Sequence, residues 1–505
     1  MKIFSSEQIK KIDELTIKNE PIASVDLMER AAGQLFKWYI DRFERSRRII
    51  IFIGPGNNGG DGLALARMLF ESRYDPHVYN IQFTDKTTKD WEINQQRLEK
   101  ETNVPFNLIY DIDQFPLICS DDIVVDAIFG SGLTHPADGL PADIIRKINL
   151  SDAEIISIDI PSGLFGEDNS SNVSDNIVKA DFTLSFQFPK LSFMFPENER
   201  FTGEWIILPI GLSNQCIQTI DSSWFLLENR DILPRLKKRN KFDHKGDYGH
   251  GLLVAGSYGK IGAAILGAKA ALKTGLGLIT CHIPSSGNYI IQTALPEAMV
   301  QIDNSEKYVS GIKQANIFSA IGIGPGIGTG SETQKAVHDL LLSCEKPLVI
   351  DADGLNILGL NKDWLSLLPK ETILTPHPKE FERIAGKTDN SFLRLKKQIE
   401  FSKAYNCVVV LKGAHSSITT PDGKVFFNST GNPGMASAGS GDVLTGIILS
   451  LLSQGYSSEN ACVTGVYLHG LAGDIAALKS CYESIIASDI IDNIGNAFIK
   501  IRSDD

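Results

Sequence analysis

Short apolar runs alternate with helix-period segments along the whole chain, and this alternation constrains the fold more than any other feature. In the first part the runs 48–53, 78–83, 123–128 and 154–160 each end in glycine, aspartate or a turn. Residues 182–188 alternate polar and apolar side chains, as at the edge of a sheet. Such alternation is typical of parallel sheets whose strands are joined by crossover helices. We therefore predict an α/β fold.

The pattern breaks near residues 215–250 and then restarts. The break contains the basic run 235–241, which we interpret as a solvated linker. After it, a helix is expected over 262–273, and a Pro-Asp-Gly-Lys turn at 421–424 predicts a hairpin. Strands are expected at 251–255, 278–283, 317–323, 347–350, 372–374, 407–411, 416–420 and 425–428. The 505 residues therefore divide into two predicted α/β domains, 1–222 and 223–505.

Charge and cysteine content exclude several classes of protein. The net charge of −12 is unsuited to coating a nucleic acid polymer or an anionic membrane surface. The seven cysteines are scattered singly without a CxxC pair, which argues against a disulfide framework and a zinc knuckle. No apolar run approaches the length of about 18 residues that a membrane span needs. We expect a cytoplasmic protein, and the apolar helices near 445–480 suggest a homo-oligomer.

A glycine-rich loop, Gly54–Gly62, follows the first strong strand and precedes a helix expected from about Leu63. Gly54, Gly56 and Gly59 satisfy the dinucleotide-binding fingerprint. The alternative is a turn whose glycines only allow tight packing. Two asparagines and Asp61 in the loop argue against a plain cofactor site, because a carboxylate repels a pyrophosphate.

Two aspartates stand at strand ends, where ligands bind in open α/β sheets. Asp126 closes one strand and Asp159 another. Oxygen atoms of Asn58, Asp126 and Ser162 would form a site for a hard cation, leaving Asp159 free for acid–base chemistry. Each aspartate alone could equally be a cap or turn residue.

The strongest local signal is the segment Gly431–Asp442, which runs into an apolar helix over 443–452. Glycines beside a helix start let backbone N–H groups point at an anion. Asp442 is badly placed to bind phosphate but well placed to take a proton from an attacking hydroxyl. The alternative role for Asp442 is a helix N-cap.

Other strand ends supply surroundings for a phosphate. Lys412–Ser416 offers hydrogen-bond donors, and the glycine-rich segment Gly322–Gly328 offers backbone that side chains do not cover. His377 is held between two prolines, which favours a functional role over a structural one. Asp351 and Asp353 could position a metal or cap the turn at 354.

Together these segments resemble the bifunctional NAD(P)H-hydrate repair enzymes over nearly the whole chain. The matching segments are Leu27–Ala31, Gly54–Gly62, Asp126–Gly132, Asp159–Gly163, Lys245–Gly249, Gly322–Gly328, Thr375–Glu380, Leu411–Ser416 and Gly431–Asp442. The resemblance implies a Rossmann-like epimerase domain, an α/β/α sandwich, that interconverts the R and S forms of NADHX and NADPHX. It also implies a ribokinase-like domain that uses ADP, with Mg²⁺, to dehydrate the S form to NAD(P)H. In that family the C6 hydroxyl is phosphorylated and phosphate then leaves.

The resemblance also assigns residues by position. Substrate-binding positions are Asn57, Asn58, Gly59, Gly60, Asp61, Gly130, Ser131, Gly132, Leu133, Thr134, His135, Pro136 and Asp159, with Ala263, Gly326, His377 and Asp442 in the second domain. Nucleotide-binding positions are Lys412, Gly413, Ala414, His415, Ser416 and Gly441. Potassium would be held by Asn58, Asp126 and Ser162, and catalysis is assigned to Asp159 and Asp442. Two residues depart from the family pattern: Lys379 stands where glycine is usual, and Ser416 where threonine is common.

Two other functions stay open at this point. One is an ADP- or ATP-dependent small-molecule kinase with a fused ligand-binding domain, which would also use Asp442 as its base. The other is a nucleotide-sensing or scaffold protein that retains the cradles without chemistry. No lysine follows Gly130–Gly132 to serve as a proton partner for Asp159, and His135 is the nearest candidate.

Overall fold

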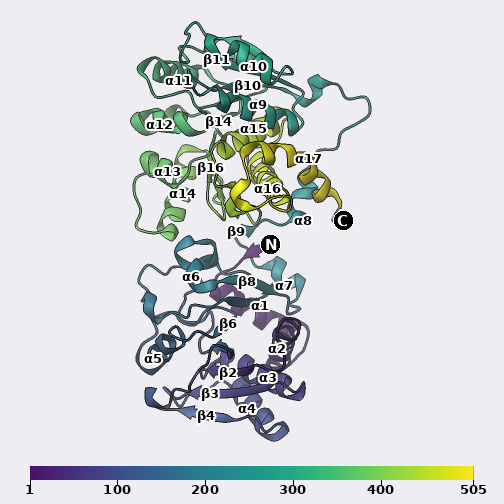
Figure 1. The fold of residues 1–505 in the computed structure, drawn as a ribbon, viewed down its shortest axis with the longest axis vertical. Coiled ribbons are helices and arrows are strands. Elements are labelled where there is room, and N and C mark those ends of the chain that lie inside the picture. Colours follow the sequence, from purple (N-terminus) through teal and green to yellow (C-terminus); the bar gives the residue numbers. More distant parts are fainter. Residues whose placement is uncertain (504–505) are drawn as a thin grey trace. The chain divides into compact units, whose positions relative to one another are not determined.

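The computed structural model describes residues 1–503, which group into two compact units (Figure 1). The first unit comprises Lys2–Ser222 with Asn390–Phe392. The second comprises Met1, Ser223–Asp389 and the chain from Leu393 onward. Each unit has its own sheet flanked by helices, so each is described by itself.

The first unit is built on a seven-stranded sheet in the order β4-β3-β2-β5-β6-β7-β8. All neighbouring strands in it run parallel. The strands are β2 (Arg48–Ile53), β3 (Asp75–Ile81), β4 (Phe106–Ile109), β5 (Ile123–Ala127), β6 (Glu154–Ile158), β7 (Phe182–Phe186) and β8 (Glu204–Leu208), preceded by the short β1 (Lys2–Ile3). The prediction that residues 182–188 form an edge is wrong, because β7 pairs with strands on both sides and β8 is the edge.

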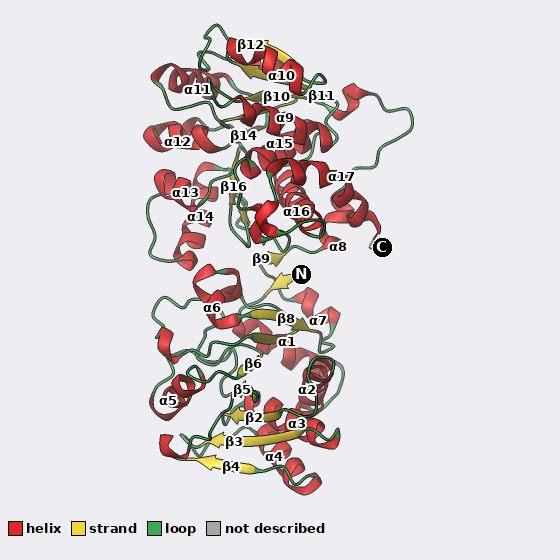
Figure 2. Cartoon of the chain, viewed as in Figure 1, coloured by secondary structure: helices red, strands yellow, loops and turns green. Residues whose placement is uncertain are grey.

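Helices cover both faces of this sheet (Figure 2). They are α1 (Ser6–Asn19), α2 (Ser24–Ile40), α3 (Asn57–Glu71), α4 (Lys89–Glu101), α5 (Gly139–Ile148), α6 (Glu199–Thr202) and α7 (Asn214–Thr219). Alternate residues of β2 belong to different cores: Ile49 and Ile51 pack with α2 and α3, whereas Ile50 and Phe52 pack with α5. Strands buried on both faces explain the unbroken apolar runs in the sequence. The predicted α/β/α layering is confirmed.

The second unit has a larger sheet in the order β9-β18-β17-β16-β15-β14-β13-β10-β11-β12. Its strands are β9 (Trp224–Leu226), β10 (His250–Val254), β11 (Leu278–Ile283), β12 (Met299–Ile302), β13 (Ala320–Ile323), β14 (Leu348–Ile350), β15 (Ile373–Leu374), β16 (Val408–Leu411), β17 (Ser417–Thr419) and β18 (Val425–Phe427). The expected hairpin is confirmed, since β17 pairs antiparallel with β18. The pairs from β10 to β16 are parallel.

Two helical layers enclose this sheet (Figure 1). One core cluster joins α9 (Ile261–Lys273), α15 (Ser440–Ser453), α16 (Ser458–Ala477) and α17 (Ala487–Ser503). The other joins α11 (Ser331–Ser343), α12 (Ala352–Leu360), α13 (Pro378–Ala385) and α14 (Ser391–Tyr405). The remaining helices are α8 (Asn229–Ile232) and α10 (Asn288–Ala294). The α/β class is confirmed here as well.

The long apolar helices that suggested a subunit contact are covered within the unit itself. Nearly every residue of α15 from Val443 to Ser453 is buried, and α16 is buried along most of its length. Their apolar character is explained by a position inside a helical layer, so it no longer argues for self-association. The homo-oligomer stays a prediction. None of the helices between residues 1 and 503 combines the length and apolar character of a membrane span.

The basic run 235–241 is solvent-exposed from Lys237 onward, as expected, but it is part of the second unit and is not a linker between the units. Lys237 Nζ donates to the carbonyls of Gln454 and Gly455, each at 2.8 Å, and Arg239 donates to the carbonyl of Gly275. These carbonyls lie just beyond the C-termini of α15 and α9, where cations satisfy orphan backbone acceptors.

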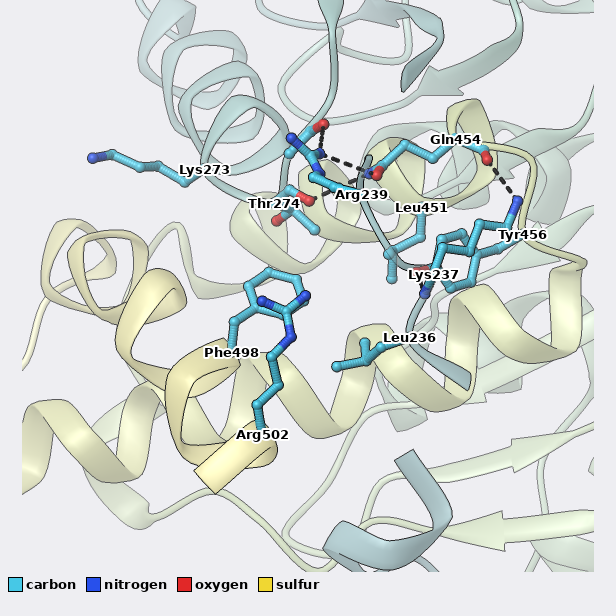
Figure 3. Close-up of a pocket in the computed structure, with 11 residues that line it drawn as sticks. Leu236, Lys237, Arg239, Lys273, Thr274, Leu451, Gln454, Tyr456, Phe498 and Arg502 are labelled. Atoms are coloured by element: carbon cyan, nitrogen blue, oxygen red, sulfur yellow. Dashed lines mark hydrogen bonds between the residues drawn. The ribbon is translucent and has the colours of Figure 1, made fainter. Parts of the chain in front are cut away.

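The same contacts form one wall of a pocket of about 210 Å³ (Figure 3). Because α9 and α15 run antiparallel to the strands, their C-terminal ends lie at the edge of the sheet opposite the strand C-termini. Strand C-termini are where ligands bind in open α/β sheets. The pocket is therefore separate from the candidate site of this unit.

Candidate functional site

Helix α3 begins at Asn57, not near Leu63 as expected, so most of the first glycine loop is helical. Its glycines permit close packing: a Cβ on Gly59 would lie 1.9 Å from the Gly54 carbonyl oxygen. A Cβ on Gly62 would lie 2.8 Å from the Ala127 side chain. The packing interpretation is thus correct for these positions. The helix start still leaves its first backbone N–H groups available to an anion at the end of β2.

The three residues expected to hold a cation lie together beside the end of β5. Asp126 is fully buried and accepts hydrogen bonds from the Ser162 hydroxyl at 2.5 Å and the Ser162 N–H at 2.8 Å. Asn58 Nδ2 donates to the Phe129 carbonyl at 3.1 Å, and Ser162 Oγ donates to the same carbonyl at 3.2 Å. Burial raises the pKa of Asp126, while hydrogen bonds from Ser162 and Ser157 oppose the rise. The cluster offers one carboxylate and otherwise neutral oxygen atoms.

Asp159 follows β6 in a left-handed conformation, with φ of 65°. Its Oδ1 accepts the Lys190 ammonium at 2.7 Å and the Phe186 N–H at 3.3 Å. Oδ2 accepts no hydrogen bond from any residue between 1 and 503. Lys190 was missed in the sequence, where His135 was the only cation considered. His135 is exposed and lies against the Pro136 carbonyl, so Lys190 is the cation in contact with Asp159.

Two further carboxyl groups lie near this pair. Burial raises the pKa of Asp13, on α1, to about 7, and the negative charge of Asp159 adds to the rise. Burial raises the pKa of Asp61, on α3, well above its ordinary value, with Asp159 and Asp13 contributing. The fold thus places three carboxyl groups near one another, and one of them, Asp159, is paired with the Lys190 ammonium. Asp61 was expected here and Asp13 was not.

The start and the middle of the loop 130–136 have different surroundings. Gly130 lies against Asn58, since a Cβ on Gly130 would be 3.4 Å from the Asn58 Cβ. Gly132, Thr134 and His135 are exposed. The structure brings the start of the loop to the cation cluster and leaves its middle in solvent.

In the second unit α15 begins at Ser440, with Gly439 as its N-cap at φ of 89°. Asp442 is therefore the third helical residue, and the alternative that it serves as the N-cap is wrong. Gly441 lies beside Lys412, another predicted nucleotide-binding position, and beside Asp351: a Cβ on Gly441 would lie 3.5 Å from Lys412 Nζ and 3.7 Å from Asp351 Oδ2. The helix start, Lys412 and Asp351 thus form one group.

The two aspartates of this group differ in their hydrogen bonds. Both oxygens of Asp351 have a donor: Oδ1 accepts a hydrogen bond from Lys412 Nζ at 2.8 Å and Oδ2 accepts one from Thr445 Oγ1 at 2.7 Å. Asp442 accepts no hydrogen bond from the described residues. Burial raises the pKa of Asp442 to about 6; the negative charge of Asp351 adds to the rise and Lys412 opposes it. Asp442 is the carboxylate left free for a ligand.

His377 has a structural role, as the N-cap of α13, in addition to any functional role. Its Nδ1 accepts the backbone N–H groups of Lys379 at 3.1 Å and Glu380 at 3.3 Å, which caps α13. Only Nε2, 3.4 Å from Glu380 Oε1, remains for other partners. Glu380 Oε2 in turn lies 4.0 Å from Lys412 Nζ, so His377 borders the same group.

Other predicted positions also meet. A Cβ on Gly326 would lie 3.2 Å from the Ala263 Cβ, so these two predicted substrate positions are adjacent. Gly413 and Ala414 are exposed beyond β16, and the Ser416 hydroxyl accepts the Gly413 N–H at 3.2 Å. His415 Nδ1 lies 3.1 Å from the Asn428 carbonyl.

Family models match both units. Residues 24–192 match the model described as YjeF-related protein N-terminus, and residues 251–496 match the model described as NAD(P)H-hydrate dehydratase. Proteins named bifunctional NAD(P)H-hydrate repair enzyme Nnr match the full length. The protein from Thermofilum pendens is 34% identical, covering 100% of this chain and 97% of its own. The protein from Moorella thermoacetica is 34% identical, covering 97% of this chain and 96% of its own.

Among solved structures, a crystal structure titled ADP/ATP-dependent NAD(P)H-hydrate dehydratase from Bacillus subtilis, co-crystallized with ATP/Mg²⁺, is 29% identical. It covers 55% of this chain and 98% of its own, with a TM-score of 0.49.

Proposed function

The chain belongs to the family of bifunctional NAD(P)H-hydrate repair enzymes, and from this premise we propose that Asp159 and Asp442 are the catalytic carboxylates of its two activities. The protein is a metabolite-repair enzyme with an epimerase domain and a dehydratase domain. Its substrates are the hydrated forms of NADH and NADPH, together with ADP or ATP. The domains are assigned to residues 1–222 and 223–505.

In the first domain, Asp159 moves the proton that epimerisation requires. The hydrated carbon C6 carries both a hydroxyl and the ring nitrogen N1, so it is a carbinolamine. Oδ2 takes the hydroxyl proton as the C6–N1 bond breaks and C6 becomes a carbonyl, and the same proton then passes to N1. Rotation about C5–C6 and the reverse steps close the ring on the other face. The free Oδ2 of Asp159 supports this role, since Oδ1 is already occupied.

Asn57–Asp61 and the loop 130–136 bind the hydrate, and its phosphates lie near the N–H groups at the start of α3. The cluster of Asn58, Asp126 and Ser162 binds potassium. The donor set fits that ion: all its atoms are oxygens, one carboxylate supplies the only formal charge, and Asn58 Oδ1 has no other partner among residues 1–503. Hard monovalent cations suit such oxygen sites, whereas zinc prefers nitrogen and sulfur. When bound, the ion supplies positive charge that offsets the buried Asp126.

In the second domain, Asp442 is the base. It takes the C6 hydroxyl proton as that oxygen attacks the terminal phosphorus of ADP, and AMP leaves. Phosphate then departs from C6 while C5 loses a proton, which restores the ring double bond. Gly441 and Lys412–Ser416 hold the nucleotide with Mg²⁺, while Ala263, Gly326 and His377 border the hydrate. The free carboxylate of Asp442 beside Lys412 and a helix start supports this assignment.

One observation carries the proposal: each unit holds a lysine–aspartate pair and a carboxylate oxygen that has no partner within residues 1–503. This oxygen belongs to the paired Asp159 in the first unit and to Asp442, beside the pair, in the second. The test is incubation of mixed NADHX epimers with ADP, following absorbance in the NADH band. We expect complete conversion of both epimers, because exchange feeds the S form to the dehydratase. Recovery of only half the material would contradict the epimerase, and no recovery would contradict the dehydratase. A phosphorylated hydrate that accumulates without NADH would favour the kinase.

A further inference from the structure

Lys190 is a buried lysine whose hydrogen-bonding capacity is fully used inside the first unit. Its side chain is 2% exposed. Nζ donates to Asp159 Oδ1 at 2.7 Å, Ser185 Oγ at 3.1 Å and the Phe188 carbonyl at 3.5 Å. An ammonium group has three N–H donors, so none remains for a substrate. Any influence of Lys190 on the reaction must therefore act through Asp159.

The contact also makes the two carboxylate oxygens of Asp159 unequal, because it occupies only one of them. Lys190 and the Phe186 N–H both occupy Oδ1, which fixes the rotation of the carboxylate. Oδ2 is left without a partner in the described chain. Burying an ammonium group costs free energy. The presence of a buried lysine beside the proposed catalytic carboxylate therefore needs an explanation.

Charge gives the second part of that explanation. Asp13 on α1 and Asp61 on α3 also face Asp159, and both are carboxyl groups. Of the three carboxyl groups, Asp159 is the one to which Lys190 donates, so the ammonium distinguishes it from its two neighbours.

We propose that Lys190 is a positioning residue of the epimerase: it holds the Asp159 carboxylate with Oδ1 fixed and Oδ2 left for the substrate hydroxyl. The inference rests on the proposed catalytic role of Asp159. Lys190 does not touch the substrate, so its effect falls on turnover rather than on binding.

The experiment compares Lys190→Met and Lys190→Gln with the unchanged full-length protein. Exchange of purified R-NADHX to the S form is measured without nucleotide, by chromatographic separation of the epimers. We expect Lys190→Met to lower kcat about 10²-fold, the low end of the range for a positioned base, with KM changed less than threefold. Lys190→Gln keeps a donor for Oδ1 but no charge, so its kcat should fall less.

The split between kcat and KM separates positioning from mere structural support. In both variants the loss should fall on kcat while KM stays within threefold, because Lys190 contacts Asp159 and leaves no donor for the substrate. A kcat within threefold of the unchanged protein in both variants would overturn the proposal. If Lys190→Met does not fold, Lys190→Gln gives the same decision.

Two controls keep the outcomes distinct. Dehydration of S-NADHX with ADP in the same samples reports that the chain is intact. Arg48→Met removes another ion pair of the same unit, between the more exposed Arg48 and Asp122 at 2.5 Å, at the N-terminal ends of β2 and β5. It should leave exchange unchanged. Absence of exchange in the unchanged protein would contradict the proposed function itself; exchange that survives in both Lys190 variants would contradict only this inference.

Discussion

Each unit of the molecule contains one lysine–aspartate pair at the end of a parallel sheet, but the two pairs leave different oxygens free. In the first unit Lys190 occupies only Oδ1 of Asp159, and the paired carboxylate itself keeps an open oxygen. In the second unit Lys412 and Thr445 occupy both oxygens of Asp351, and the open carboxylate is its neighbour Asp442. Under the proposed assignments, the same kind of ion pair therefore includes the reacting carboxylate in one unit and supports the predicted nucleotide-binding residues in the other.

The largest effect should come from Asp442→Asn. Removing a positioned base should lower dehydration of S-NADHX about 10³-fold, measured as NADH absorbance with saturating ADP. Nucleotide binding, followed by calorimetry, should persist because Lys412 and Gly441 are untouched. Exchange of the epimers is the internal control. Near-normal dehydration would place the base elsewhere, and Asp351 would be the next carboxylate to test.

Asp159→Asn should lower epimer exchange about 10²-fold or more while S-NADHX is still dehydrated. The asparagine keeps the shape of the side chain but cannot accept a proton. Chromatography of R and S forms without nucleotide gives the rate. Loss of both activities together would contradict the assignment of one carboxylate to each unit.

The pH dependence of dehydration should show the raised pKa of Asp442, about 6. A base works when ionised, which is the state above its pKa, so activity should be level above pH 7. Below pH 6 kcat should fall tenfold for each pH unit, measured at saturating ADP. The residual kcat of Asp442→Asn should not fall in this way below pH 6. If it did, the fall in activity would come from the titration of another group.

The smallest effect should come from Thr445→Val, which removes one bond to the supporting pair. Loss of a buried hydrogen bond to a carboxylate should lower the free energy of unfolding by about 2 kcal/mol. Dehydration should fall less than threefold, since Asp442 is unaffected. Urea unfolding followed by circular dichroism measures the first quantity.

A matched control for that variant lies in α16. Thr464 is also fully buried, but its hydroxyl has no hydrogen-bond partner in the structure. Thr464→Val should therefore be neutral or slightly stabilising. Equal destabilisation by both substitutions would mean that Asp351 does not depend on Thr445.

The sequence predicted the central strands because parallel strands are apolar on both faces, but it missed β4, β8, β9 and β12, which lie at or next to the ends of the two sheets. It pointed to Asp159 and Asp442 because both are carboxyl groups beside glycine-rich or strand-end segments, and their catalytic roles stay predictions. The start of α3 was misplaced for a physical reason. The glycines at 59, 60 and 62 have low helix propensity, yet the chain is helical from Asn57 because each of them packs closely, against the Gly54 carbonyl, Met28 and Ala127 respectively. Lys190 could not be found by local pattern. Parallel pairing of β6 with β7 brings it to Asp159, 31 residues away in sequence. A lysine directly after an apolar strand was the one available signal.

The attachment of residues 235–241 to the second unit also bears on how a two-activity chain can arise or be divided. Strand β9 pairs with β18 from Trp224 onward, and the basic run that follows it caps α9 and α15. A gene split within or after the basic run would therefore strip the dehydratase of a strand and of the cations at two helix ends. A split between Ser222 and Ser223 removes neither. A cut at that junction would therefore keep both of these elements with the dehydratase.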